Sequence, residues 1–434
     1  MRMRKWILVL LALLTACSFL WAGGQGAAEK PTIRIAHQFK GGIGGDFGKW
    51  FPEALDEWAA EHSELATYVQ EAEQGDNLRN KIKLDLAANN LPDIVAYWSL
   101  QSLMPMIEEG LLADVKEYFT ESTATDWEDY YESALNDFKY QGKYYAIPSG
   151  GFKDYYMCNR ELFQKYGLEY PKTYEDLLAV SKKFAANGII PLAVGSKGGN
   201  PAHFLFGEMY YQVGSLDYMN KIKTGETSFN HPLVVQTAER VLEMARGGVF
   251  PKDTIGSGDF QPAVALYNDE RAAMILAQTW AVWWFKEDIV KKSDLIFFPK
   301  IKGAKNDPST FCVGNVNGGW IIKKESWDDP AKRKAIIAVM DWIISDEVLR
   351  KSAESGGGPL YKKVDLTGTK VPLLASMVND FTKGQASWTN LWSQMPDPVS
   401  QEVFSVTLDE LWAQNISAQE FVEKVTASIE KALK

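Results

Sequence analysis

The stretch Leu78–Trp98, LRNKIKLDLAANNLPDIVAYW, joins two different sequence patterns across one turn. Residues 78–90 are typical of a helix, and residues 91–98 form an apolar run that Pro92 and Asp93 introduce as a strand. The neighbouring segments repeat this alternation of short strands with helices of about 10 to 15 residues. Such alternation predicts α/β units built around a largely parallel sheet.

The segment before this stretch begins with TIRIAHQF, residues 32–39, which alternates like a strand. It leads into the glycine-rich KGGIGGDFG, residues 40–48, which invites comparison with a dinucleotide-binding loop. Gly42 and Gly44 fit that pattern, but the third glycine falls out of register. We therefore interpret these residues as a flexible loop of a cleft, and we predict no cofactor.

The length of the chain and two extended segments predict its division into lobes. A chain of 434 residues is too long for one ordinary core and indicates two domains. Extended crossings near residues 148–158 and 310–320 separate α/β material of similar type, which predicts two lobes joined by hinge strands around a ligand cleft. We assign residues 31–148 and 314–360 to the N-lobe, and residues 149–313 and 361–434, with the C-terminal helices, to the C-lobe.

Two later segments carry clear helix signals. Residues 330–355 are predicted to form one helix, which the glycines and proline of residues 356–359 end. Residues 417–433 begin with Ser417 and have Glu420 three positions on, which is the pattern of a capping box.

Composition excludes several classes of protein. The hydrophobic fraction of 46% and the charged fraction of 24% are those of a folded soluble protein. The net charge of −10 argues against nucleic acid as a partner, because phosphate binding requires clustered Lys and Arg.

The first residues have the pattern of an export signal. The basic start MRMRK and the apolar run Trp6–Leu14 predict a secretory signal peptide over residues 1–22, followed by a linker over residues 23–30. The segment ending at Cys17, Leu-Thr-Ala-Cys, also resembles a bacterial lipobox, in which Cys17 would carry lipid. Both endings stay open, so we expect an exported protein in the periplasm or on the outer face of the cytoplasmic membrane.

Cysteine and histidine usage gives no metal or redox motif. Cys158 and Cys312 can form a disulfide in an exported chain, but spacing alone does not decide this. The histidines have no metal-ligand spacing, and we predict no metal site; they are His37, His62, His203 and His231.

Several short patterns, taken in order, resemble one family, the family 1 extracellular solute-binding proteins of ABC importers, which includes the maltose-binding proteins. The resemblance covers nearly all of the mature chain. The segments that carry it are residues 81–98, 106–119, 142–195, 270–285 and 356–363. Cys158 stands where the family usually has Tyr, and Gln278 and Thr279 replace the commoner Gly before Trp280. The resemblance implies a periplasmic-binding-protein-like α/β fold, but these departures weaken any transfer of sugar identity.

Two tryptophans at strand ends are the principal candidates for ligand platforms. Trp98 ends DIVAYW and Trp280 follows AMILAQ, and ligands of open α/β sheets bind beyond the carboxyl ends of strands. The resemblance also implies an aromatic cleft residue at Trp98 and a sugar-stacking one at Trp280. Trp283 and Trp284 lie three and four residues further, so we expect them to anchor a helix in the core.

Further aromatic candidates follow from the resemblance. It implies another stacking position at His203 or Phe204, and one more in the segment ASWTNLW at Trp388 or Trp392. Trp320 follows the second hinge and is a candidate for either the cleft or hinge packing.

Polar candidates lie in loops at strand ends. Their amide and carboxylate groups suit sugar hydroxyls, because charge-assisted hydrogen bonds are strong. A solvated surface position is the alternative for each acid. The candidates are Gln38, Asp46, Glu73, Gln74 and Asp154.

These features predict a binding protein rather than an enzyme. We expect a monomer that closes its lobes over a mono- or oligosaccharide and delivers it to the membrane subunits of an ABC permease. A secreted glycoside hydrolase is one alternative, although nothing fixes a carboxylate pair. Another is a different solute: ferric iron at Tyr155 and Tyr156, or a polyamine at Asp46 and Asp154.

Overall fold

The computed structural model describes residues 30–40, 45–197, 202–222, 225–254, 256, 260–314, 316–356, 360–396 and 399–434. The predicted signal peptide, Cys17 and nearly all of the linker lie outside these residues, as do residues 41–44 of the glycine-rich loop. Among the described residues, no helix has the length and apolar character needed to cross a membrane.

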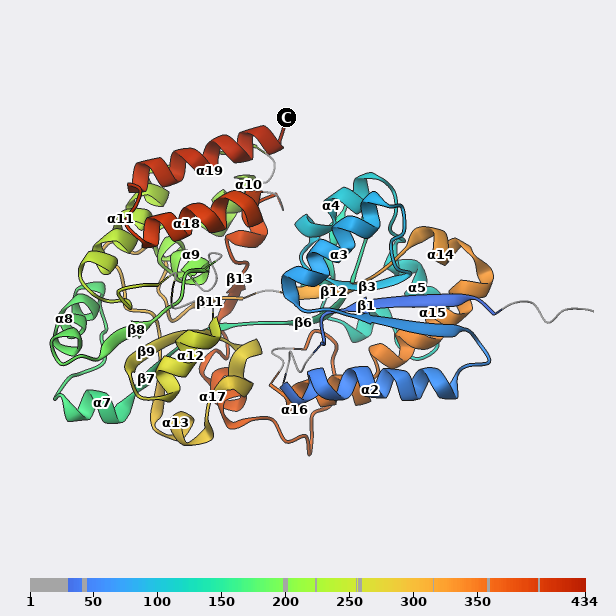
Figure 1. The fold of residues 1–434 in the computed structure, drawn as a ribbon, viewed down its shortest axis with the longest axis horizontal. Coiled ribbons are helices and arrows are strands. Elements are labelled where there is room, and N and C mark those ends of the chain that lie inside the picture. The colour runs from blue at the N-terminus through green and yellow to red at the C-terminus, as the bar shows by residue number, and fades with distance from the viewer. Residues whose placement is uncertain are drawn as a thin grey trace, which may run out of the picture.

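Two lobes lie side by side in Figure 1, each built on one β-sheet. The N-lobe sheet has the order β2-β1-β3-β12-β6, and the C-lobe sheet has the order β10-β7-β9-β8. The N-lobe strands are β1 (Thr32–His37), β2 (Thr67–Ala72), β3 (Ile94–Tyr97), β6 (Ile147–Gly151) and β12 (Val316–Ile322). The C-lobe strands are β7 (Asp154–Asn159), β8 (Ile190–Ala193), β9 (Ala272–Gln278) and β10 (Ser293–Ile296).

The sheets are mixed, which corrects the prediction of a largely parallel sheet. In the N-lobe, β1 runs parallel to β2 and β3, but β12 is antiparallel to β3 and β6. In the C-lobe, β8 and β9 are parallel, whereas β7 is antiparallel to β9 and β10. The cause is that β7 and β12 enter their sheets directly from the crossings, without the covering helix that a parallel connection requires.

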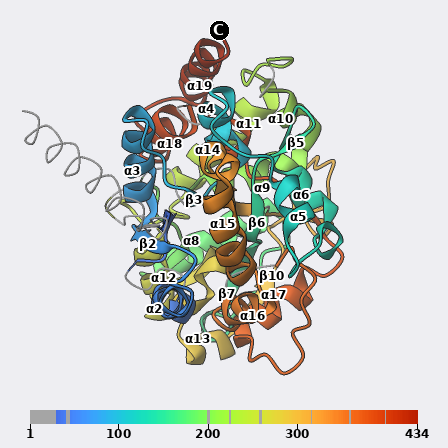
Figure 2. The same cartoon turned by 90° about the vertical axis from the view of Figure 1, so that its right-hand side faces the viewer.

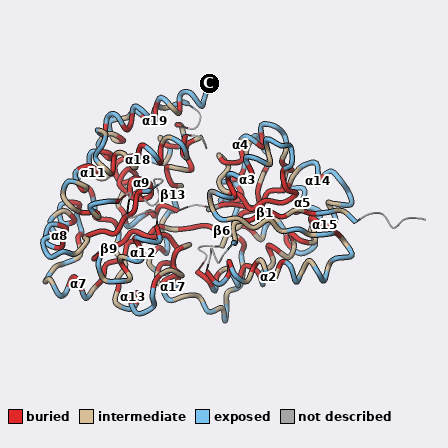
Figure 3. The backbone as a smooth tube through the Cα atoms, viewed as in Figure 1, coloured by how far each residue is buried: buried red, intermediate tan, exposed pale blue. Residues whose placement is uncertain are grey.

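Helices cover both faces of each sheet, and the buried backbone in Figure 3 is concentrated inside each lobe. In Figure 2 the N-lobe faces the viewer and α2 is seen end-on below α15. The N-lobe helices are α2 (Gly45–Glu61), α3 (Gly75–Ala87), α4 (Leu100–Glu108), α5 (Val115–Glu121), α6 (Glu132–Asn136), α14 (Lys324–Asp328), α15 (Pro330–Ile343) and α16 (Asp346–Glu354). The C-lobe helices are α7 (Arg160–Lys165), α8 (Tyr174–Ala186), α9 (Ala202–Val213), α10 (Leu216–Ile222), α11 (Pro232–Arg246), α12 (Phe260–Asn268), α13 (Glu287–Lys291), α17 (Leu373–Phe381), α18 (Ser405–Trp412) and α19 (Ala418–Ala432).

The stretch that predicted the fold forms α3, a turn and β3, as expected. Leu78 and Ile82 bury one side of α3 against the same core that contains Val95 of β3. The turn after α3 contains Asn89 with a φ of 53°, a left-handed conformation that Asn tolerates better than most residues.

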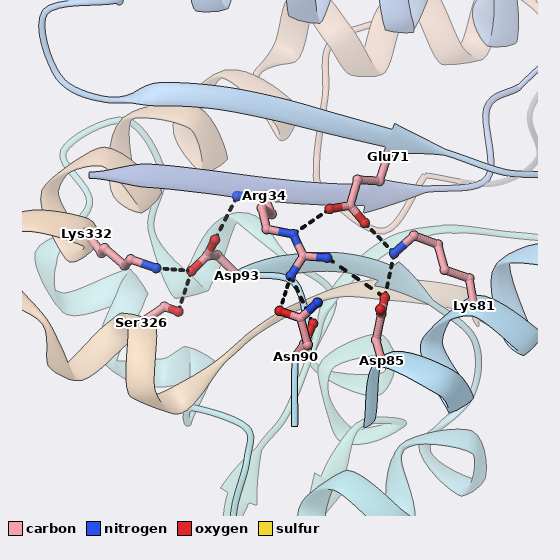
Figure 4. Close-up of polar contacts among 8 residues, drawn as sticks. All are labelled: Arg34, Glu71, Lys81, Asp85, Asn90, Asp93, Ser326 and Lys332. Atoms are coloured by element: carbon pink, nitrogen blue, oxygen red, sulfur yellow. Dashed lines mark hydrogen bonds and ion pairs between the residues drawn. The ribbon is translucent and has the colours of Figure 1, made fainter. Parts of the chain in front are cut away.

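Asp93, at the entrance to β3, connects the sheet to the returning chain (Figure 4). Its carboxylate accepts hydrogen bonds from the Arg34 backbone N–H at 2.7 Å, the Ser326 hydroxyl at 2.5 Å and the Lys332 ammonium at 2.8 Å. Asp93 is buried, so these partners supply the hydrogen bonds that water would otherwise give. One side chain thereby ties β1 and β3 to α14 and α15.

The helix signals were partly right. Residues 330–355 form two helices, α15 and α16, because the Ser345 side chain accepts the Val348 N–H and begins a new helix. The predicted capping box is confirmed: Ser417 accepts the Glu420 N–H, and the Glu420 carboxylate accepts the Ser417 N–H.

The crossings between the lobes lie against one another. The first runs from β6 through Phe152 into β7, and the second runs from β11 (Phe311–Val313) through Gly314 into β12. A Cβ at Gly314 would lie 2.4 Å from the Phe152 carbonyl oxygen, so glycine is required for this close approach. Two smaller pairings complete the strands: β11 with β13 (Ala386–Trp388), and the antiparallel hairpin of β4 (Lys139–Tyr140) with β5 (Lys143–Tyr144).

Cys158 and Cys312 are both buried and both present as free thiols. Cys158 lies in β7 and Cys312 in β11. Burial is the main cause that raises the pKa of Cys312 to about 12, so this thiol is protonated at neutral pH. Because both thiols are free, the possible disulfide between Cys158 and Cys312 is not formed in this structure.

Candidate ligand-binding cleft

A cavity of about 510 Å³ lies between the two lobes and is lined by both. This volume is within the range of small-molecule sites. Its N-lobe wall lies beyond the carboxyl ends of β1 and β3, and its C-lobe wall includes the turn after β9 and the start of α9. The position follows the rule that ligands of open α/β sheets bind where strands end and helices begin.

Tryptophans are the most prominent feature of the cavity wall. Trp98 and Trp320 come from the N-lobe sheet. The C-lobe adds Trp280, Trp283, Trp284 and Trp392. Trp320 is 4% exposed and packs in the N-lobe core as well as lining the cavity. The other five are partly exposed, which leaves ring surface for a ligand.

The turn Thr279–Trp284 gathers three of these rings at the cavity. It is a 3₁₀-helix, in which residues three apart share a face, and its buried residues are Thr279, Ala281 and Val282. Trp283 Nε1 donates a hydrogen bond to the Trp280 carbonyl at 2.9 Å. Trp283 and Trp284 line the cavity beside Trp280. For Trp283 this corrects the expectation of a core position, whereas Trp284 also packs against the C-lobe core, as expected.

The Trp280 ring packs against two other aromatic rings of the C-lobe. Its ring centroid is 4.8 Å from that of Phe260, and Trp284 meets it edge-on at 5.5 Å. These contacts hold one side of the indole in the C-lobe and fix its orientation at the cavity wall.

Trp98 carries a cation on its face. The Arg79 guanidinium carbon lies 3.8 Å from the Trp98 ring centroid and 5.0 Å from that of Trp392. Arg79 belongs to α3 of the N-lobe and is 6% exposed, whereas Trp392 belongs to the C-lobe. Arg79 was not among the predicted residues; the available signal was a basic residue in the second turn of the helix that follows the end of β2.

His203 and Phe204 both line the cavity, at the start of α9. Burial lowers the pKa of His203 to about 3, so its imidazole is neutral at ordinary pH. His203 is 6% exposed and its Nδ1 has no hydrogen-bond partner, which leaves this atom for a ligand group. Phe204 packs edge-on against Phe152 of the first crossing at 5.3 Å.

Of the two late candidates, the structure brings Trp392 to the cavity wall and not Trp388. Trp388 stacks on Phe311 with centroids 4.5 Å apart and an interplanar angle of 12°. The reason is that β13 pairs with β11, which turns Trp388 onto the neighbouring strand.

Among the polar candidates, Gln38 lines the cavity and the two residues after β2 do not. Glu73 forms an ion pair with Lys40 at 2.9 Å, and Gln74 donates to the Lys40 carbonyl at 2.9 Å. Both side chains thus bind the loop after β1 instead of facing the cavity.

The two predicted aspartates also lie away from the cavity wall. Asp46 is exposed and pairs with Lys49 one turn along α2. Asp154 is buried in the C-lobe, where its carboxylate accepts a hydrogen bond from Gln278 Nε2 at 3.1 Å. Burial, with the nearby Glu208 carboxyl adding to it, raises the pKa of Asp154 well above its ordinary value.

The charged side chains among the described lining residues of the cavity are both basic. Arg79 comes from the N-lobe and Lys197 from the segment after β8 in the C-lobe. Over the described part of the chain, no aspartate or glutamate lines this cavity. The neutral polar groups include Gln38, Ser149 and Asn390, which suit hydroxyl groups.

Among the described residues, the side chains suggested for other solutes do not line the cavity. Tyr155 and Tyr156, the candidates for ferric iron, are buried in the C-lobe cores. Asp46 and Asp154, the candidates for a polyamine, lie outside the wall as described. Within the described ranges, no three His, Cys, Asp or Glu side chains are grouped so as to hold a metal ion.

Comparison with known proteins gives a consistent result. Residues 42–349 match the family model described as bacterial extracellular solute-binding protein. An uncharacterized ABC transporter extracellular-binding protein of Pyrococcus horikoshii is 27% identical over 215 residues, which are 49% of this chain and 47% of that relative. The galactooligosaccharide-binding protein of Bacillus subtilis is 25% identical over 63% of this chain and 62% of its own length.

The curated relatives are thus matched over about half their length. Among solved structures, a chitin oligosaccharide binding protein superposes with a TM-score of 0.81 at 18% identity, covering 93% of this chain and 99% of that one. At this identity the likeness establishes the fold, and the α/β fold with two lobes predicted from the sequence is confirmed.

Proposed function

The chain belongs to the bacterial extracellular solute-binding proteins, and we propose that it captures a saccharide in the cleft between its lobes. The observation that carries the proposal is the pair Trp98 and Trp280, which line one cavity from opposite lobes. A sugar ring has an apolar C–H face and a rim of hydroxyls, so it needs flat aromatic platforms surrounded by donors and acceptors. This cavity supplies both.

Delivery to a membrane permease is the second part of the proposal. The solute-binding family serves ABC importers, so the partners would be permease membrane subunits, with the protein acting as an exported monomer. The similarity to a galactooligosaccharide-binding protein and to a chitin oligosaccharide binding protein supports a saccharide ligand. Whether Cys17 carries a lipid or the chain is cleaved after residue 22 would be read from the mass of the mature N-terminus.

Ligand capture would couple to closure of the lobes. A ligand that touches both walls stabilises the closed arrangement by its differential affinity for that state. Contacts between the lobes support such coupling. Gly45 of the N-lobe lies so close to the Trp283 side chain of the C-lobe that a Cβ added at Gly45 would be 3.0 Å from Trp283 Cγ. The Arg79–Trp392 contact is a second bridge.

Binding is favoured over catalysis by the chemistry of the wall. Glycoside hydrolases act with two carboxyl groups placed about 5 to 10 Å apart at the scissile bond. The described residues of this cavity wall supply no such pair. We therefore propose a binding protein without glycosidase activity, and hydrolysis of chromogenic glycosides would contradict this.

The test is a panel of mono- and oligosaccharides screened by thermal shift and by intrinsic tryptophan fluorescence. We expect one class of saccharide to raise the melting temperature and to change the emission, because the ligand would cover indole rings of the cleft. If amino acids, polyamines or metal ions stabilise the protein and no saccharide does, the proposed function is wrong.

A further inference from the structure

Two buried carboxyl groups lie near one another where the crossings enter the C-lobe. Asp154 is the first residue of β7, and Glu208 belongs to α9. Side chains two apart on a strand share a face, so Asp154 points to the side of the sheet on which Tyr156 packs in one core with α9. The Glu208 charge is close enough to raise the pKa of Asp154, after burial itself. Among the described residues, neither carboxyl has an ion-pair partner.

This carboxyl pair, Asp154 and Glu208, contacts three segments that position the C-lobe wall of the cleft. Glu208 Oε1 accepts the N–H of Val313, the last residue of β11 before the second crossing, at 3.1 Å. Asp154 follows the first crossing, and its Oδ1 accepts a hydrogen bond from Gln278 Nε2 at 3.1 Å. Gln278 directly precedes the turn Thr279–Trp284, which brings its tryptophans to the cavity. A change in the charge of the pair therefore acts on both crossings and on this turn.

The first crossing is also bound directly to the same turn. The Lys153 N–H donates to the Thr279 hydroxyl at 3.1 Å, and the Thr279 N–H donates to the Lys153 carbonyl at 3.1 Å. The Lys153 ammonium points to the Thr382 hydroxyl at 3.0 Å, so it does not form an ion pair with either carboxyl. Movement at Asp154, the next residue along the chain, is thus passed to the turn.

The hydrogen bonds of the carboxyl pair favour a protonated state. Asp154 Oδ2 and Gln278 Oε1 are buried and have no hydrogen-bond partner among the described residues. A protonated carboxyl has an O–H to donate, whereas an ionised one only accepts. Two ionised carboxylates buried without a cation repel each other and lose their hydration. Loss of the last proton from the pair therefore favours separation of the elements around it.

The other ionisable groups that face the pair stay neutral around neutral pH. Tyr155 and Tyr156 of β7, Tyr211 of α9 and Cys312 of β11 are buried, and burial raises the pKa of each. Burial lowers the pKa of His203, earlier on α9, to about 3. Among the described groups of this region, the carboxyl pair is thus the one whose charge changes as the pH rises from about 5.5 to about 9.

We propose that Asp154 and Glu208 form a proton-dependent positioning element, which holds the crossings and the turn Thr279–Trp284 in the saccharide-binding arrangement while it keeps a proton. The inference rests on the proposed function and adds its regulation by pH. Saccharide binding stabilises the arrangement in which the pair is buried, and this arrangement holds the proton more tightly. Binding therefore takes up protons, and affinity falls as the pH rises through the pKa of the pair.

The test is isothermal titration calorimetry of the native protein at several pH values. Neutral trisaccharides of glucose, galactose, mannose, xylose and N-acetylglucosamine are the probes, because none of them titrates in the range used. For the one that binds, we expect affinity to fall about tenfold between about pH 5.5 and about pH 9, which corresponds to a difference of about one pKa unit between the bound and free protein. The binding enthalpy near pH 7 should also depend on the ionisation enthalpy of the buffer, because protons are taken up.

Conservative variants assign the pH dependence to the pair. Asp154→Asn combined with Glu208→Gln keeps the shape of both side chains and removes both titrating groups. We expect this double variant to bind with nearly constant affinity over the same pH range and without an effect of the buffer. Glu208→Gln alone should retain at most part of the fall in affinity. Glu243→Gln changes an exposed carboxyl of α11 outside the cavity, and this control should keep the full native profile.

The outcomes separate this inference from the proposed function. A trisaccharide that binds the native protein with the same affinity at all pH values would overturn the proton-dependent element and leave saccharide binding standing. The same fall in affinity in the double variant would also overturn it, because another group would then be responsible. If calcium chloride restores native affinity at high pH but does not affect the double variant, the pair holds a cation in place of a proton. If no trisaccharide binds at any pH, the proposed function itself fails.

Discussion

The guanidinium of Arg79 contacts the ring of Trp98 in its own lobe at 3.8 Å and the ring of Trp392 in the other lobe at 5.0 Å. Both distances are within the range of about 6 Å over which a cation is attracted to an aromatic face. One side chain thus spans the cleft between two aromatic platforms. A ligand that stacks on Trp98 must displace Arg79 or bind beside it, so this residue governs access to that platform.

Removal of the Trp283 indole should weaken binding more than it weakens the fold. The ring lines the cavity and rests against Gly45 of the other lobe, so it contributes to closure. We expect Trp283→Ala to reduce saccharide affinity about tenfold, measured by calorimetry. Trp388→Ala, which removes an indole outside the cavity, should leave affinity unchanged and lower the free energy of unfolding by about 2 kcal/mol. Unchanged binding in Trp283→Ala would return this residue to a purely structural role.

Loss of the Asp93 carboxylate should destabilise the N-lobe. Asp93→Ala leaves the Lys332 ammonium and the Arg34 N–H without their buried acceptor, and we expect a loss of about 3–5 kcal/mol in urea unfolding. Asp328→Ala is the control, because its ion pair with Lys324 is half exposed and should be worth at most about 1 kcal/mol. Equal effects of the two substitutions would refute the role given to Asp93.

Stability should depend on the protonation of Glu208. Burial raises the pKa of this carboxyl to about 7 from an ordinary value of 4.5, so the folded protein keeps a proton that the unfolded chain releases. The contribution is fully present below about pH 4.5 and is lost as the pH rises through about 7. As the pH rises from about 4.5 to about 7, the unfolding free energy of Glu208→Gln should therefore increase relative to that of the native protein. Above about pH 7 the difference between the two free energies should stay constant.

Urea unfolding of both proteins between pH 4 and pH 9 measures this difference. Subtracting the unfolding free energies of the two proteins also removes the contribution of His37, which both contain. Burial lowers the pKa of His37 to about 4, so its contribution to stability is lost as the pH falls. A difference that does not vary with pH would mean that burial does not raise the pKa of Glu208 in the folded protein.

The crossing at Gly314 should not accept a side chain. Gly314→Ala places a Cβ 2.4 Å from the Phe152 carbonyl oxygen, so the two crossings must separate. We expect this variant to lose about 2 kcal/mol or more of stability. Gly207→Ala in α9 is the control, since its Cβ would find ordinary contacts at 3.8 Å and Ala favours helix. Comparable melting temperatures for the two variants would contradict the close approach of the crossings.

The residues show which parts of this structure could be predicted from sequence. Trp98 and Trp280 were assigned to the cleft because strand ends in α/β sheets converge on one edge, and local pattern identifies strand ends. Trp283 was misplaced because spacing of three and four suggests an α-helix, and the chain forms a 3₁₀ turn instead, while Trp284 packs on the core as predicted. Sequence spacing alone does not distinguish an α-helix from a 3₁₀-helix.

The charge of the cleft was the larger error. Glu73 and Asp154 lie at strand ends and Asp46 lies at the start of α2, but their side chains are turned to Lys40, Gln278 and Lys49. Which way a loop side chain points depends on partners that are distant in sequence, so position alone does not predict it. Arg79 was missed for the same reason, because its neighbour Trp392 comes from the other lobe and is distant in sequence.

The central claim, a saccharide held between tryptophans of both lobes, is tested most directly by calorimetry on Trp280→Ala beside the native protein and Trp388→Ala. With the saccharide that the screen identifies, we predict the same affinity for the native protein and Trp388→Ala, and a loss of about a hundredfold for Trp280→Ala. Both variants remove a ring that packs on the C-lobe core, so both should stay folded with a lowered melting temperature. Native affinity in Trp280→Ala, or the same loss in Trp388→Ala, would contradict the account.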